Sequence, residues 1–197
     1  MRQWNKVIEI GPPKTGTSSL GQAFKLLGLR WASWNAELYD QYQQGDYTQI
    51  LETAQNYDAF EDAPWHCVGT YKQMDQAFPN SKFILLERDL DSWVESYINH
   101  FSDQRNRNQI DTKYLKSDLE SQQAEVAKIY LDINAERKAY FKDRPEDLLI
   151  MNICAGEGWE TLCPFLELPI PKTPFPRTNV TPTWQQRLKQ RIRQLMP

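Results

Sequence analysis

Residues 7–20 read Val-Ile-Glu-Ile-Gly-Pro-Pro-Lys-Thr-Gly-Thr-Ser-Ser-Leu, and this stretch decides how the rest of the chain is interpreted. A β-branched run ends at Gly11, a turn follows, and hydroxyl residues lead into an expected helix. Such a turn directs backbone N–H groups, a positive helix end and the Lys14 ammonium at one point, which favours phosphate or sulfate. Gly11 and Gly16 have the spacing of the nucleotide-triphosphatase loop, but that loop carries its lysine after the second glycine. Here the lysine precedes Gly16, so the stretch differs from an ATP-binding loop.

A second anion-binding segment is predicted at residues 82–97, which read as a buried strand, a turn and a helix. Arg88 follows the strand directly, and Ser96 lies eight residues further on. A planar guanidinium can hold a phosphate through two parallel hydrogen bonds, which suits Arg88 to this position. The alternative is a surface salt bridge between Arg88 and Glu87 or Asp89.

Three segments, taken in order, resemble the sulfotransferases that use 3′-phosphoadenosine 5′-phosphosulfate (PAPS). Pro-Lys-Thr-Gly-Thr-Ser-Ser is similar to their 5′-phosphosulfate loop, and the Arg88 segment is similar to their 3′-phosphate segment, although Leu90 replaces the usual proline. Residues 154–166, Cys-Ala-Gly-Glu-Gly-Trp-Glu-Thr-Leu-Cys-Pro-Phe-Leu, resemble a segment of a short sulfotransferase-like branch. Pro-Phe-Pro at 174–176 and Asn179 also fit that branch, so the resemblance runs from about residue 7 to 179.

The resemblance implies a set of cofactor-binding residues for PAPS and its product, 3′,5′-adenosine bisphosphate (PAP). They are Pro13, Lys14, Thr15, Gly16, Thr17, Ser18 and Ser19 for the phosphosulfate, Arg88 and Ser96 for the 3′-phosphate, and Gly156 and Gly158 in the closing segment. Relatives carry Arg-Lys before the glycine of that closing segment, and this chain lacks the basic pair. For Ser18 and Ser19, capping of the helix is the alternative role.

The resemblance also implies in-line transfer of a sulfuryl group to a hydroxyl or amine of a small acceptor, without a metal. Lys14 would stabilise charge on the leaving phosphosulfate oxygen. The general base of the cytosolic enzymes is a histidine two residues before a proline, and Asp62 stands at that place here. Glu61 and His66 are the rival bases. The alternatives are an N-cap role for Asp62 and a helix-surface position for His66.

Composition limits the partners and the compartment. The 197 residues are 40% hydrophobic and 25% charged, with a net charge of −3, which predicts a globular chain without the basic face that nucleic acids require. No apolar run approaches the roughly 20 residues that span a bilayer, so no membrane partner is expected. Three cysteines cannot pair completely, which favours a reducing, cytoplasmic location. The acceptor and the oligomeric state stay open.

Apolar strands that alternate with helices predict an α/β fold, a three-layer P-loop-type parallel sheet with helices on both faces. Strands are expected at 5–10, 58–61, 82–87 and 148–152. Further expectations are short helices on either side of Gly45, helices near 66–78 and 115–142, a loop at 102–113, and a Pro-rich strap and docking helix within 169–197. Residues 1–197 are expected to form one domain. Two other functions remain open: a sulfotransferase-like module that binds without transfer, and a P-loop kinase or nucleotidase.

Overall fold

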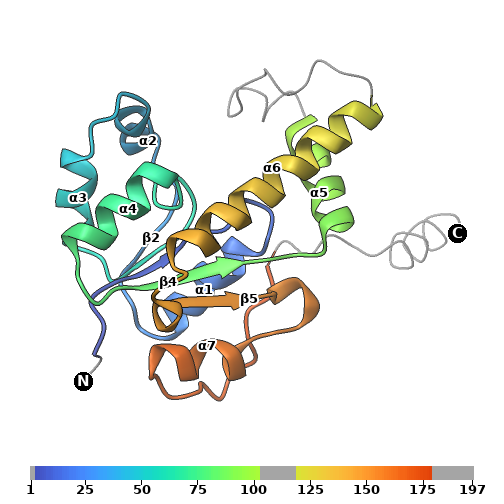
Figure 1. Cartoon of the computed structure of the whole chain (residues 1–197). Coiled ribbons are helices and arrows are strands. Elements are labelled where there is room, and N and C mark those ends of the chain that lie inside the picture. The colour runs from blue at the N-terminus through green and yellow to red at the C-terminus, as the bar shows by residue number, and fades with distance from the viewer. Residues whose placement is uncertain (1–2, 103–118, 179–197) are drawn as a thin grey trace, which may run out of the picture.

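The computed structural model describes residues 3–102 and 119–178, and it contains a five-stranded parallel sheet. The strand order is β2-β3-β1-β4-β5, and every neighbouring pair is parallel. The strands are β1 (Val7–Glu9), β2 (Trp31–Ala32), β3 (Ala59–Phe60), β4 (Lys82–Leu86) and β5 (Leu148–Met151). Helices cover both faces of this sheet, so the predicted three-layer α/β fold is confirmed (Figure 1).

Alternating side chains of the strands build two separate hydrophobic cores, one on each face. Val7 and Ile84 belong to the core that α1 and α7 cover, whereas Ile8 and Phe83 belong to the core under α2, α3 and α4. All four side chains are fully buried. Strands buried on both faces read as continuous apolar runs, which is why the sequence showed them so clearly.

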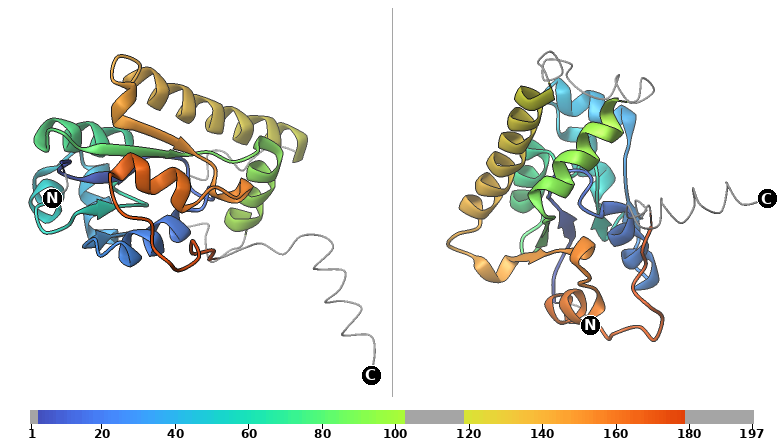
Figure 2. Two further views of the ribbon diagram at one scale, coloured as in Figure 1. Left: turned by 90° about the horizontal axis from the view of Figure 1, so that it is seen from below. Right: turned by 90° about the vertical axis from the view of Figure 1, so that its right-hand side faces the viewer.

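The helices alternate with the strands along the chain. They are α1 (Thr17–Leu26), α2 (Ala36–Gln43), α3 (Thr48–Ala54), α4 (Val68–Ala77), α5 (Leu90–Ser102), α6 (Leu119–Tyr140) and α7 (Trp159–Leu166). Two short 3-10 helices, Pro145–Asp147 and Ile153–Ala155, flank β5. A third apolar cluster joins α5 to α6, and these two helices run side by side in Figure 2.

Two expectations about elements need correction. Sequence reasoning missed β2, because two residues carry no readable period, and this strand forms by pairing with β3. The helix expected near 66–78 begins only at Val68, because residues 63–66 form turns before it. The other strands and the short helices around Gly45 lie where the sequence predicted them.

Some predictions concern residues that the structure does not describe. The loop at 102–113, apart from its first residue, the first part of the long helix and the C-terminal docking helix lie outside the described residues. The strap is described up to Thr178 and is extended, without helix or strand. Within residues 3–102 and 119–178, no helix combines the length and the apolar character that crossing a bilayer requires.

Candidate functional site

The sheet topology brings three separate segments to one edge. β1 lies between β3 and β4, and the chain crosses from one side of β1 to the other between these strands. The segments that follow β1, β3 and β4 carry Lys14, Asp62 and Arg88. In open parallel sheets, ligands bind at the carboxyl ends of the strands where the connections diverge in this way.

The turn after β1 has a left-handed backbone at two positions. Lys14 has φ 71° and Gly16 has φ 111°. A Cβ atom on Gly16 would lie 3.3 Å from the Cβ of Ile153, so both the conformation and the packing require glycine there. Gly16 is the N-cap of α1, which has no side-chain cap and no acidic residue in its first turn. The first N–H groups of this helix therefore meet no carboxylate from the helix itself, as an anion site requires.

Internal contacts already occupy two hydroxyls of the predicted phosphosulfate loop. The buried Thr15 hydroxyl donates to the carbonyl of Pro12 at 2.8 Å. The Ser19 hydroxyl accepts the backbone N–H of Thr178 at 3.0 Å, which ties the strap to α1. These two side chains shape the loop, whereas Ser18 is exposed on the first turn of α1.

The guanidinium of Arg88 lies against the backbone of Lys14, the other predicted cation. The Arg88 guanidinium donates from Nη1 to the carbonyl oxygen of Lys14 at 3.1 Å and from Nε to the Ser92 hydroxyl at 3.2 Å. Burial, and after it the charge of Arg88, lowers the pKa of Lys14. A cation that lowers the pKa of a neighbouring lysine makes an anion beside both of them favourable.

Arg88 is held in place by its surroundings and does not form the surface salt bridge considered as its alternative. Its backbone N–H donates to the Tyr130 hydroxyl at 2.8 Å, and that hydroxyl donates to the Arg88 carbonyl at 2.6 Å. Glu87 pairs with Lys138 at 2.7 Å, and Asp89 accepts the backbone N–H of Ser92 at 3.0 Å.

Serines follow Arg88 at helical spacing along α5. Ser92 and Ser96 lie four and eight residues after Arg88 and share one face of α5, and Arg88 itself lies two residues before this helix begins. Sequence reasoning named Ser96 and missed Ser92, although the spacing of four residues from Arg88 was a readable signal. Of these two serines, Ser92 is the one for which the structure shows a bond to Arg88.

Asp62 and Glu61 lie on the other side of β1. Asp62 has φ 67°, and its Oδ1 accepts the backbone N–H of Ala63 at 2.8 Å. Cys67 is the N-cap of α4, so the N-cap role considered for Asp62 is wrong. Glu61 is buried and accepts the Ser33 hydroxyl at 2.5 Å, and burial raises its pKa. Asp62 is the less enclosed carboxylate, and its charge acts on Lys14.

His66 lies in the turn before α4, not on the surface of a helix. Its Nδ1 is buried and lies 4.0 Å from Oε2 of Glu9, the last residue of β1. Sequence reasoning missed Glu9, whose only signal was a charged residue inside an apolar strand.

The glycine segment after β5 packs against the phosphate loop, and a strap residue covers it. Cys154 Sγ donates to the Thr15 carbonyl at 3.6 Å. Arg177 donates from its two Nη atoms to the carbonyls of Ile153 and Gly156, both at 3.0 Å. The strap thereby brings a guanidinium to Gly156, where the sequence lacks the family's basic pair. Gly158, the N-cap of α7, lies under the ring of Phe175.

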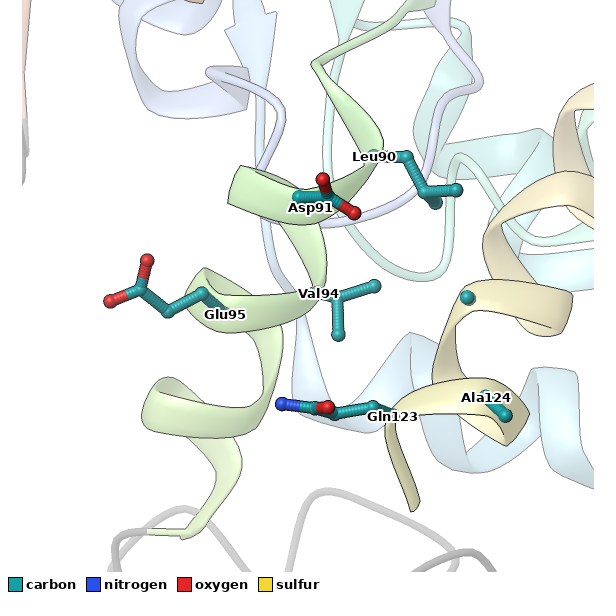
Figure 3. A pocket seen from close by; sticks show the side chains of 7 residues that line it. Leu90, Asp91, Val94, Glu95, Gln123 and Ala124 are labelled. Atoms are coloured by element: carbon teal, nitrogen blue, oxygen red, sulfur yellow. The ribbon is translucent and has the colours of Figure 1, made fainter. Parts of the chain in front are cut away.

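A separate groove of about 510 Å³ lies between α5 and α6 (Figure 3). None of the predicted site residues lines it. The residues that line it are Leu90, Asp91, Val94, Glu95, Gln123, Ala124 and Ala127. Two carboxylates and no cation among these residues make the groove unsuitable for an anionic nucleotide. Within the described residues, no group of three or more His, Cys, Asp or Glu side chains could hold a metal ion.

Comparison with known proteins agrees with this geometry. A family model described as a sulfotransferase domain matches residues 6–117 and 104–184, which together cover most of the chain. No curated protein matches the chain. The matched residues include all three segments that meet at the edge of the sheet. The chain therefore belongs to the sulfotransferase domain family.

Proposed function

We propose that this protein transfers a sulfuryl group from PAPS to a hydroxyl or amine of a small acceptor. The observation that carries the proposal is the convergence of Lys14, Arg88 and the uncapped N-terminus of α1 at one edge of the sheet. PAPS carries anionic groups at both its 5′ and 3′ positions, and it would supply the sulfuryl group. The two cations and the N–H groups at the start of α1 can bind anionic groups at two different positions of one molecule.

The residues of the phosphate loop would bind and neutralise the phosphosulfate. Lys14 and the backbone N–H groups from Gly16 to Ser18 would stabilise negative charge that develops on the leaving oxygen. Pro13 fixes the start of the turn, since its carbonyl accepts the indole N–H of Trp93 at 2.7 Å. The Thr17 side chain helps to lower the pKa of Glu61, which sets the loop beside the acceptor side.

The 3′-phosphate would lie beside Arg88, whose guanidinium is already oriented by Lys14 and Ser92. Ser92 and Ser96 would supply hydroxyl donors along α5. Gly156 and Gly158 would line the closing segment, where Arg177 adds a positive charge.

Asp62 would act as the general base that accepts the acceptor proton. It follows β3 at the same sheet edge as Lys14, and it is more open than Glu61. Glu61 is bonded to Ser33 and fits a supporting role, and His66 remains the second candidate for the base. A carboxylate that lies beside the donor loop can take the proton as the new bond forms.

The cysteines and the net charge bear on the location and the partners. We infer a reducing, cytoplasmic location, because all three cysteines are free thiols. We expect a small acceptor and no nucleic acid or membrane partner, since the net charge is −3.

The proposal is tested by turnover of ³⁵S-labelled PAPS over a panel of phenols, alcohols and amines. We expect label to move to at least one acceptor, and Asp62→Asn to reduce the rate without reducing PAP binding. Tight PAP binding without transfer to any acceptor would favour the alternative, a nucleotide-binding module. Magnesium-dependent hydrolysis or transfer of ATP phosphate would favour the kinase or nucleotidase interpretation.

A further inference from the structure

The floor of the site contains two buried polar atoms that have no partner. They are Oε2 of Glu9 and Nδ1 of His66. The Glu9 side chain is 0% exposed and the His66 side chain 15% exposed, and these two atoms lie 4.0 Å apart. Buried polar atoms without partners are rare and costly. These two atoms face each other at 4.0 Å, which is longer than a hydrogen bond, so they would share a proton only after a small approach.

The hydrogen bonds of Glu9 show where its proton must lie. Oε1 accepts the backbone N–H of Gly11 at 2.6 Å, so this oxygen is an acceptor. A proton on the carboxyl group therefore belongs on Oε2, the oxygen that faces His66. Nδ1 is then the acceptor, and His66 carries its own hydrogen on Nε2, the nitrogen that is not among the sealed atoms.

Burial favours this neutral arrangement over an ion pair. Burial raises the pKa of Glu9, and the charges of Glu61 and Asp62 raise it further. Burial lowers the pKa of His66 to about 4, although the charge of Asp62 opposes this shift. Both shifts favour the uncharged forms of the two residues.

One cation, Arg137 of α6, also faces the pair, but three of its five donors are engaged elsewhere. Nε donates to the Ile10 carbonyl at 3.0 Å, Nη2 to the His66 carbonyl at 3.1 Å, and Nη1 to Glu136 at 3.0 Å. Its charge is the last of the causes that act on either residue. Arg137 fixes the backbone around the pair and does not neutralise Glu9 directly.

We propose that Glu9 is a positioning residue that holds His66 as a neutral Nε2–H donor beside Asp62, within a carboxylic acid–imidazole pair. A donor there stabilises the Asp62 carboxylate without adding a positive charge to a site that already holds Lys14 and Arg88. This role in acceptor activation rests on the proposed function, whereas the protonation pattern of the pair does not.

The pair is tested by long-range ¹H–¹⁵N spectroscopy of the full chain labelled with ¹⁵N-histidine. The chain has two histidines, and a His100→Gln variant assigns the signals. We expect the Nε2–H tautomer for His66 at pH 7, with no protonation above about pH 5. A dominant Nδ1–H tautomer, or an imidazolium at pH 6–7, would overturn the proposal.

Substitutions of Glu9 separate a neutral acid from a carboxylate. Gln can accept from Gly11 and donate to Nδ1, so Glu9→Gln should leave the tautomer and the titration of His66 unchanged. If Glu9 were ionised, the same substitution would switch the tautomer, which would contradict the proposal. Glu9→Leu should abolish the single tautomer, and the Gln variant decides the matter even where the Leu variant fails to fold.

Kinetics extend the test to the reaction. With Glu9→Gln we expect kcat and its pH profile within about threefold of the wild type, because the donor is retained. A large fall in kcat with an unchanged tautomer would overturn the positioning role. The spectra need neither nucleotide nor acceptor. Failure of PAP binding would therefore refute the proposed function, whereas the tautomer of His66 would still test the Glu9–His66 pair.

Discussion

Replacement of Arg88 by alanine should weaken binding of PAP by about a hundredfold to ten-thousandfold. A guanidinium has five N–H donors. Two are engaged, with Ser92 and with the Lys14 carbonyl, which leaves three for a ligand. Two charge-assisted bonds to a phosphate contribute about 1.5–3 kcal/mol each, and tenfold in affinity corresponds to about 1.4 kcal/mol.

Lys14 should recover part of this loss. The charge of Arg88 contributes to the lowered pKa of Lys14, so its removal makes the Lys14 ammonium easier to keep charged. The expected loss therefore lies toward the lower end of the range. Arg88→Lys keeps the charge but not the planar fork, and we expect an intermediate loss of about tenfold.

Calorimetric titration of PAP into each variant measures the effect. Lys128→Ala is the matched control, since it removes one positive charge from an exposed pair with Asp132. We expect this control to bind as the wild type does. Affinity of Arg88→Ala within about threefold of the wild type, with a normally folded protein, would refute the assignment of Arg88 to the 3′-phosphate.

Three further predictions concern the loop and the buried pair. Lys14→Met should lower kcat of PAPS turnover by about a hundredfold or more, as loss of an electrostatic stabiliser does, and an unchanged kcat would exclude that role. Gly16→Ala should lower the melting temperature and PAP affinity together, because φ is 111° and the new Cβ would crowd Ile153; normal stability would contradict this geometry. Glu9 has a raised pKa in the folded protein, so it stabilises the fold at low pH, and this stability is lost as pH rises above about 4.5 toward the folded pKa. His66 has a lowered pKa, so the fold loses up to about 3 kcal/mol of stability as pH falls from 6.5 to about 4. On acidification Glu9 adds stability and His66 removes it. Without the Glu9 carboxyl, the free energy of unfolding of Glu9→Gln, measured with denaturant, should therefore fall more steeply on acidification than that of the wild type. An unchanged dependence on pH would contradict the proposed carboxylic acid–imidazole pair.

The sequence predicted the elements whose residues have long apolar runs. β1 and β4 are buried on both faces, and their pattern was readable without any partner. β2 was not readable, because Trp31–Ala32 forms a strand only through its pairing with Ala59–Phe60. The start of α4 was misplaced for a similar reason, since the turns at residues 63–66 come from local backbone bonds and not from periodicity.

The candidate site was partly predictable. Lys14 and Arg88 carried signals in their order and spacing, and the structure brings them into contact. Glu9, Ser92 and Arg177 were missed. The partners of Glu9 and Arg177 are distant in the chain, and contacts such as those between Glu9 and His66 exist only after the sheet has formed.

The most direct test of the central claim is calorimetric titration of the wild-type protein with PAP, beside adenosine 2′,5′-bisphosphate, AMP and ATP. The 2′,5′ isomer has the same composition and number of phosphates as PAP, so it isolates the position of the second phosphate. We predict micromolar or tighter binding of PAP and at least tenfold weaker binding of the other three. Equal binding of the two bisphosphates, or a preference for ATP, would contradict the assignment of this site to PAPS.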